Sequence, residues 1–340
     1  MDGVTEFDSE ACRSMRPGEN CGGEEALMTG VTVVVPVYNS EQSLSPLVTR
    51  IESVLGSRDL SFEILLVNDG STDGSWAVIE SLAGRHRSVV GVELRRNYGQ
   101  HNALLCGWRL ARYAVCVTID DDLQNPPEEI PQLLEALTAD HDVVYGVPYR
   151  QKHTFFRLMA SKVTKFVLRH AMGAEAAGAV SSFRAFRTQL RNAISEYHSP
   201  HVCIDVMLTW TTRRFQSVSV EHRERESGKS TYTASKLFAH ALNMLTGYST
   251  TLLRLASMLG FICAFFGLSI LGYVLVRFAL IGSPVPGFPF LASIIAIFSG
   301  AQLVSLGIIG EYLARMHFRL MDRPVYSVRR VTVEVCDDAG

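Results

Sequence analysis

Two long apolar segments constrain the fold of this chain more than any other feature. Residues 252–280 carry only two charges, Arg254 and Arg277, and residues 288–309 carry none. Each segment is longer than the ~20 residues that an α-helix needs to cross the hydrocarbon core of a bilayer. The sequence therefore predicts two transmembrane helices, about 252–280 and 288–312, in a membrane region 251–314. A buried hairpin in a soluble core is the alternative, which the length and the near-absence of charge disfavour.

Basic residues gather just outside this pair of segments, and the linker between the segments carries none. The positive-inside rule places such flanks in the cytoplasm. We therefore expect the catalytic part and both termini in the cytoplasm, with the protein in the plasma (inner) membrane. Residues 237–250 have mixed apolar and polar faces, which predicts an interfacial amphipathic helix within 233–250. The flanking basic residues are Arg213, Arg214, Arg223, Arg225, Lys229 and Lys236 before the pair, and Arg315, Arg319, Arg323, Arg329 and Arg330 after it.

The rest of the chain is far more polar than this membrane region. The formal net charge of the 340 residues is −2, so we expect no nucleic-acid partner. The seven cysteines form no Cys-x-x-Cys pair, which disfavours a zinc site or a disulfide framework. Residues 1–30 are rich in Gly and Glu and predict a disordered tail, and residues 315–340 are expected to form a cytoplasmic C-terminal segment.

Residues 31–232 alternate between β-branched runs and helical patterns. Such alternation predicts an α/β fold, with a Rossmann-like, mostly parallel sheet and helices on both faces. Strands are expected at 31–35, 64–67, 115–119 and 142–147, from residue 89, and from residue 218. Helices are expected at 41–55, 74–83 and 102–113, and the basic region 153–187 is also predicted to be helical. No Gly-x-Gly-x-x-Gly follows the first strand and no P-loop motif occurs, so those nucleotide folds are disfavoured.

The predicted strand 115–119 ends in three adjacent carboxylates, Asp120, Asp121 and Asp122. Open α/β sheets bind their ligands at the carboxyl ends of strands. A bound cation would relieve the repulsion between the carboxylates, and the Gln124 amide could supply a further oxygen. Mg²⁺ or Mn²⁺ suits such oxygen donors. The alternative is a solvated acidic turn whose aspartates only cap a helix.

Polar residues also follow the neighbouring predicted strands. Tyr38 and Asn39 come after the first strand and Asp69 after the second, where they could hold a base or a ribose. Arg95 and Arg96 follow the third strand and could meet diphosphate oxygens. The alternative is ordinary turn chemistry, which is the more frequent role of an aromatic and an amide such as Tyr38 and Asn39 and which would account for Asp69 unaided.

Together these features predict a nucleotide-and-metal site, a basic patch and a membrane hairpin. A metal at Asp120, Asp122 and Gln124 could neutralise the diphosphate of a nucleotide-sugar. Basic residues near the membrane suit an anionic lipid headgroup, and a lipid phosphate is one. Because that phosphate is already ionised at neutral pH, it could attack the sugar without a general base.

Short motifs spread over residues 31–328 carry a family resemblance. The narrowest are Asp-Asp-Asp-Leu-Gln-Asn-Pro-Pro-Glu at 120–128 and Gly-Glu-Tyr-Leu-Ala-Arg at 310–315. The others are Val-Pro-Val-Tyr-Asn at 35–39, Asn-Asp-Gly-Ser-Thr-Asp at 68–73, Arg-Asn-Tyr-Gly-Gln-His at 96–101, Phe-Arg-Ala-Phe-Arg at 183–187, Arg-x-x-Gly-x-Ser at 225–230 and Arg-Pro-x-Tyr at 323–326. On these motifs the chain resembles the polyprenyl-phosphate glycosyltransferases of glycosyltransferase family 2.

The resemblance implies a GT-A fold and an inverting single displacement. It implies transfer of a sugar from a nucleotide-sugar, with UDP expected, to a polyprenyl phosphate at the bilayer surface. Nucleotide contacts are implied at Pro36, Tyr38, Asn39, Asp69 and Asp121. The metal, Mg²⁺ or Mn²⁺, is implied at Asp120, Asp122 and Gln124. The expected catalytic set is Asp120, Asp122, Arg150, Arg184 and Arg225, and the expected acceptor-phosphate ligands are Arg184, Arg225 and Lys229.

Three positions depart from the usual motifs of the family. Ser40 stands where a Glu is usual, Asn68 replaces the commoner Asp, and Thr231 replaces a frequent Lys. Lys229 lies two positions before Thr231 and could replace that Lys. The sequence leaves open the sugar, the polyprenol length and the oligomeric state, although Gly260, Gly267 and Gly272 would allow close packing into a homo-oligomer.

Two other functions fit parts of this pattern. A processive polysaccharide synthase shares the catalytic fold but usually carries a Gln-x-x-Arg-Trp motif and more membrane helices, which the sequence does not show. A non-catalytic membrane scaffold with a degenerate transferase domain is the second alternative. The retained set of Asp120, Asp122 and Gln124 argues against a degenerate site.

Overall fold

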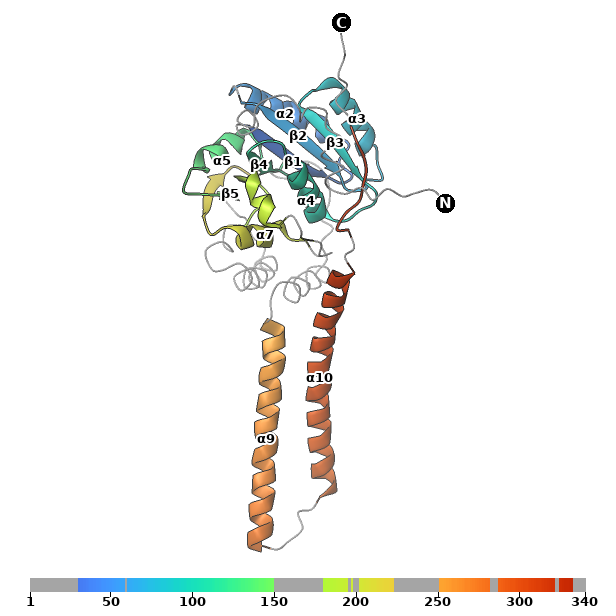
Figure 1. Cartoon of the computed structure of the whole chain (residues 1–340), viewed down its shortest axis with the longest axis vertical. Helices are drawn as coiled ribbons and strands as arrows, with labels where there is room; N and C mark the ends of the chain where they lie inside the picture. The colour runs from blue at the N-terminus through green and yellow to red at the C-terminus, as the bar shows by residue number, and fades with distance from the viewer. Residues whose placement is uncertain are drawn as a thin grey trace, which may run out of the picture. The chain divides into compact units, whose positions relative to one another are not determined.

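The computed structural model describes residues 30–58, 60–149, 180–194, 197, 202–222, 251–281, 287–321 and 324–332 (Figure 1). The chain divides into two units, Met1–Thr231 with Arg323–Gly340, and Tyr232–Asp322. They are called here the sheet unit and the hairpin unit. Residues 1–29 of the expected tail at 1–30 lie outside the described residues, as do the expected interfacial helix at 233–250 and Arg150, Arg225 and Lys229.

The described residues of the sheet unit form an eight-stranded sheet of order β7-β5-β6-β4-β1-β2-β3-β8. The pairs β4–β1, β1–β2, β2–β3 and β5–β7 are parallel, whereas β6 and β8 run antiparallel to their neighbours. The predicted α/β, mostly parallel sheet is therefore confirmed. The strands are β1 Val31–Val37, β2 Phe62–Asn68, β3 Val89–Leu94, β4 Val115–Thr118, β5 Val143–Pro148, β6 Arg184–Arg187, β7 Phe215–Val220 and β8 Val328–Val331.

Helices pack on both faces of the sheet, and each face has its own hydrophobic core. Helices α2 Leu44–Gly56, α3 Ser75–Arg85 and α5 Ile130–Ala136 contribute to one core, and helices α4 Gln100–Leu110 and α7 Ile204–Thr211 to the other. Short 3₁₀ helices are η1 Pro127–Glu129 and η3 Thr188–Ile194. The sequence of strand β1 is uniformly apolar because both of its faces are buried. Val33 and Val35 pack in the first core and Val34 in the second.

The prediction of helix through 183–187 is wrong, because these residues lead into and form strand β6. Their side chains alternate between the two cores, with Phe183 and Ala185 in one and Phe186 in the other. That two-residue period is the pattern of a buried strand. The regular spacing of basic residues before it had favoured a helix.

Strand β8 brings the C-terminal segment back to the sheet. It pairs antiparallel with β3 at the sheet edge. Arg330 forms an ion pair with the largely buried Glu93, with 2.6 Å between Nε and Oε2. The chain thus leaves the sheet after β7 and re-enters the same sheet at β8.

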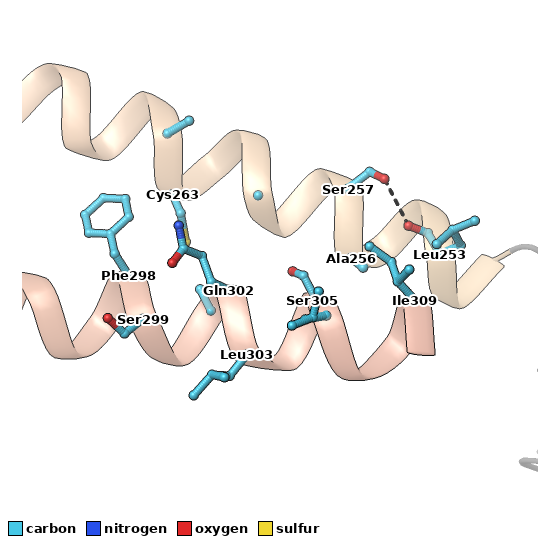
Figure 2. A pocket seen from close by; sticks show the side chains of 14 residues that line it. Leu253, Ala256, Ser257, Cys263, Phe298, Ser299, Gln302, Leu303, Ser305 and Ile309 are labelled. Atoms are coloured by element: carbon cyan, nitrogen blue, oxygen red, sulfur yellow. Dashed lines mark hydrogen bonds between the residues drawn. The ribbon is translucent and has the colours of Figure 1, made fainter. Parts of the chain in front are cut away.

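In its described part, the hairpin unit has two long helices, α9 Thr251–Ile281 and α10 Phe288–Leu320, which run antiparallel (Figure 1). Both are long and apolar enough to cross a membrane, with mean hydropathies of 2.3 over Leu253–Arg277 and 1.4 over Ile297–Ala314. The helices approach closely at Gly267, where an added Cβ would lie 2.8 Å from the Phe298 ring. A groove of about 840 Å³ lies between them, and Figure 2 shows Gln302 of α10 beside Cys263 of α9 in that groove.

Candidate functional site

The candidate site lies at the carboxyl ends of the adjacent strands β2, β1 and β4. Asp121, after β4, accepts hydrogen bonds from the Tyr38 backbone N–H at 3.1 Å and from the Ser40 hydroxyl at 2.5 Å. These bonds join the turn after β1 to the turn after β4. The hydroxyl of Ser40 thus contacts Asp121 directly, and a carboxylate at position 40 would repel Asp121.

The turns after β1 and β2 are also joined. Asn39 has a positive φ of 54°, which Asn tolerates better than most residues. Its side-chain oxygen accepts the Thr72 backbone N–H at 2.8 Å, and its own backbone N–H donates to the Ser71 hydroxyl at 3.0 Å. Tyr38 remains half-exposed beside this turn, so its ring is accessible to a ligand.

Asp69 holds the loop before helix α4. Its two carboxylate oxygens accept the backbone N–H groups of Tyr98 at 2.7 Å and Gly99 at 2.8 Å. Burial raises the pKa of Asp69, although these two bonds act to lower it. The structure thus gives Asp69 a role in positioning the loop, and its predicted nucleotide contact stays a prediction.

The Asp120 carboxylate accepts hydrogen bonds from two different parts of the chain. The Gln100 amide, at the start of α4, donates to Oδ1 at 2.7 Å, and the Ser182 hydroxyl, just before β6, donates to Oδ2 at 2.5 Å. Burial raises the pKa of Asp120, and the Asp122 charge raises it further. Burial also raises the pKa of Asp121 to about 6. A nearby cation would favour the charged form of these carboxylates.

The turn after Asp120 has a strained backbone. Leu123 has a φ of 59°, in the left-handed region that a residue of this size rarely adopts. The Gln124 backbone N–H donates to Asp122 Oδ1 at 3.2 Å. The donors offered by Asp120, Asp122 and Gln124 are all oxygens, which fits Mg²⁺ or Mn²⁺. Each carboxylate oxygen has two lone pairs, so the hydrogen bonds to Asp120 leave acceptor sites for a metal.

A buried ionic network lies behind Asp120, and three of its residues were not singled out from the sequence. Arg184 is 1% exposed and forms an ion pair with Asp205 of α7. Its Nε donates to the Thr118 hydroxyl at 3.1 Å, and the Tyr145 hydroxyl donates to Asp205 at 3.1 Å. The sequence signal was a lone carboxylate in the apolar run Ile-Asp-Val-Met-Leu, since a charge in such a helix requires a buried partner.

Arg184 was predicted to bind the acceptor phosphate. Its described contacts are instead internal, and the Asp205 charge raises its pKa against the lowering effect of burial. Asp205 also lies near His101 and Cys203, whose ligand atoms fall with its own within 4.8 Å of one another. Arg184 already pairs with this carboxylate, and burial raises the pKa of the Cys203 thiol to about 12. The group is thus poorly suited to a metal.

The structure brings together some of the predicted residues. Pro36 lies in β1 beside Val67 of β2. Asp120, Asp121 and Asp122 have different hydrogen-bond partners: the first accepts from Gln100 and Ser182, the second from Tyr38 and Ser40, and the third from the Gln124 backbone N–H. Gln100 and Ser182 complete the surroundings of Asp120, and sequence reasoning had missed both. No short-range signal identifies them, because they reach Asp120 from α4 and from the start of β6.

Comparisons with known proteins give matches to one family and to curated relatives. The family described as glycosyl transferase family 2 matches residues 32–194. The chain is 35% identical over 306 residues to an undecaprenyl-phosphate 4-deoxy-4-formamido-L-arabinose transferase of Sodalis glossinidius (strain morsitans), with 88% of this chain and 93% of the relative covered. The protein of the same name from Serratia proteamaculans (strain 568) is 35% identical over 308 residues, covering 89% and 94%.

Solved structures give a more distant likeness. One is the crystal structure of glucosyl-3-phosphoglycerate synthase from Mycobacterium tuberculosis in complex with Mn²⁺, uridine diphosphate and phosphoglyceric acid. Its TM-score is 0.49 at 18% sequence identity, over 68% of this chain and 82% of that chain.

Proposed function

Since this chain belongs to glycosyl transferase family 2 and is a glycosyltransferase, we propose that it transfers a sugar from a nucleotide-sugar to a polyprenyl phosphate. The proposed donor is UDP-linked, and the product is a polyprenyl-monophosphate-sugar. The observation that carries this proposal is the 35% identity to a transferase named for undecaprenyl phosphate, over 88% of this chain. This match is much longer than the residues 32–194 that the family model covers.

The metal ligands of the proposed enzyme are Asp120, Asp122 and Gln124. A Mg²⁺ or Mn²⁺ ion at these oxygens would neutralise the charge that builds on the departing diphosphate. Gln100 and Ser182 hold the Asp120 carboxylate in one orientation by their hydrogen bonds. Asp121 holds the Tyr38 turn beside it. We propose that Pro36, Tyr38, Asn39 and Asp69 complete the nucleotide site.

The acceptor reacts without a general base in this mechanism. A phosphate monoester is ionised at neutral pH, and its oxygen attacks the anomeric carbon as the bond to the diphosphate breaks. A single displacement of this kind inverts the anomeric configuration. We propose that Arg150, Arg225 and Lys229 bind the phosphates, because guanidinium and ammonium groups suit them. Arg184 could join them only if its pair with Asp205 opened.

The topology proposed for the membrane rests partly on the sheet. Strands β7 and β8 belong to one sheet, so the chain between them crosses a bilayer an even number of times. Two crossings by α9 and α10 satisfy this condition. The basic flanks place the sheet unit and both termini on the cytoplasmic side of the plasma (inner) membrane.

The proposal is tested by offering the full chain, in detergent, a panel of UDP- and GDP-sugars with undecaprenyl phosphate and Mg²⁺ or Mn²⁺. We expect one donor to give a lipid-linked product by mass spectrometry, with the anomeric configuration inverted by NMR. Nucleotide release without lipid product would point to another acceptor, such as the growing polymer of a polysaccharide synthase. Absence of turnover with every donor, from folded protein, would favour a non-catalytic scaffold.

A further inference from the structure

We infer that Asp205 is a positioning residue for the Asp120 carboxylate, acting through Arg184, Thr118 and Ser182. These four residues are called here the Asp205 network. The inference rests on the proposed function, because in the proposed function Asp120 binds a metal. It assigns a task to a carboxylate on α7 and gives Arg184 an internal role in place of a contact with the acceptor.

The first link is the register of β4 and β6. Thr118 and Arg184 are direct partners in this antiparallel pair. The Arg184 Nε donates to the Thr118 hydroxyl at 3.1 Å. A guanidinium has no acceptor, so the Thr118 oxygen must accept this bond. Its single hydrogen is then directed elsewhere, to the Ser182 carbonyl at 2.6 Å.

The second link joins Ser182 to Asp120. Ser182 lies two residues before β6 begins, outside the paired register of β4 and β6. The bond from Thr118 ties this residue back to β4. From there the Ser182 hydroxyl donates to Asp120 Oδ2 at 2.5 Å. Fixing the Ser182 backbone therefore fixes one of the two donors that orient the Asp120 carboxylate.

The third link explains why Asp205 is needed. Arg184 is 1% exposed, and an uncompensated buried guanidinium is strongly destabilising. Asp205 balances this charge and accepts a further bond from Tyr145 at 3.1 Å. The Arg184 charge already acts to lower the pKa of Asp120, so without the Asp205 charge we expect Arg184 to be drawn to the Asp120 carboxylate. Arg184 would then compete with the metal for Asp120.

The test is direct Mn²⁺ binding to the full chain in detergent with UDP, followed by electron paramagnetic resonance. Asp205→Asn should weaken Mn²⁺ binding about 10-fold, within the range known for residues that orient metal ligands. Ser182→Ala should have a similar effect. Because both changes break one chain of contacts, the double variant should bind Mn²⁺ about as weakly as either single variant. The KM for undecaprenyl phosphate should change little.

Glu63→Gln is the matched control. Glu63 is 5% exposed and also accepts side-chain and backbone hydrogen bonds, from Thr32 and Arg112, but at the opposite end of the sheet. The Glu63→Gln substitution should lower the unfolding temperature of the protein without changing its affinity for Mn²⁺. Should Asp205→Asn fail to fold, Thr118→Val carries the same test, since it removes the intervening hydroxyl and leaves the ion pair intact.

The outcomes separate this inference from the proposed function. If wild-type protein binds Mn²⁺ and Asp205→Asn binds it equally well, the inference is overturned while the proposed function stands. A raised KM for the acceptor with unchanged Mn²⁺ affinity would also overturn it and return Arg184 to the acceptor phosphate. If wild-type protein binds no Mn²⁺, both the metal site and the inference fail.

Discussion

The sheet unit and the hairpin unit use the same apolar residue types in opposite ways. In the sheet unit, Leu65 and Leu66 of β2 are 0% exposed, because both faces of the sheet are covered. In the hairpin unit, Phe261 and Leu268 of α9 are 78% and 67% exposed. An exposed apolar surface of this extent is costly in water and favourable in lipid. The comparison teaches that the sheet unit encloses its own core, whereas the hairpin exposes an apolar surface that suits a lipid bilayer.

The largest effect we predict is a loss of catalysis that leaves membrane attachment unchanged. Asp122→Asn should reduce sugar transfer by a factor on the order of 10²–10³, because a lost metal ligand removes several kcal/mol of charge stabilisation. Circular dichroism and recovery in the membrane fraction should not change. Asp140→Asn, at an exposed position of the sheet unit, is the control and should keep full activity. A variant at Asp122 that retained most of the wild-type rate would refute the metal assignment.

A substitution in the hairpin should do the opposite and impair membrane attachment. Leu268→Asp places a charge near the centre of α9, at a cost of roughly 2.5–3.5 kcal/mol for membrane insertion. We expect a large fraction of this variant to be released by alkaline carbonate, while Leu268→Ala stays in the membrane. Retention of the Asp variant would show that α9 does not lie in lipid at that position.

A smaller effect is expected where two turns of the sheet unit meet. Ser40→Ala removes the hydroxyl that donates to Asp121, a bond worth about 1 kcal/mol. The KM for the donor should rise a few-fold with little change in kcat, since the Tyr38 turn loses one of its two ties to Asp121. Steady-state kinetics with varied donor would check this, and an unchanged KM would show that the bond from Ser40 to Asp121 does not influence donor binding.

The smallest effect concerns the edge strand β8. Arg330 pairs with Glu93 and Glu80 from a half-exposed position, and such pairs contribute about 1 kcal/mol or less. Arg330→Gln should lower the unfolding temperature of the protein slightly and leave transfer unchanged. A loss of activity would show that the return of the chain to the sheet influences the site.

The sequence was most informative where structure depends on neighbours along the chain. The β-branched runs located β1, β2 and β4, and uninterrupted apolar length located α9 and α10. Strands β6 and β8 were not identified, because each is defined by pairing with a distant strand. For the same reason Gln100, Ser182 and Asp205 were missed as parts of the site, since their roles depend on contacts between α4, β6 and α7.

The candidate site followed a similar division. The turn at 120–124 could be identified from the sequence, because three carboxylates follow a predicted buried strand. The pair of Arg184 and Asp205 could be identified only from the folded structure. Arg184 shows the limit most plainly: the motif around it suggested a phosphate ligand, and only the packing of α7 against β6 reveals its buried partner. The assignments of Arg150, Arg225 and Lys229 stay predictions, because these residues lie outside the described part of the chain.

The most direct measurement follows lipid product through removal and return of the metal. Wild-type protein would be incubated with undecaprenyl phosphate and the donor found in the panel, first with EDTA and then with Mg²⁺ or Mn²⁺ restored. We predict that the lipid-phosphate-sugar, followed by mass spectrometry, disappears with EDTA and returns with the metal, and that Asp122→Asn makes little product in either case. Undiminished product in EDTA, or nucleotide release without any lipid-linked sugar, would contradict the account.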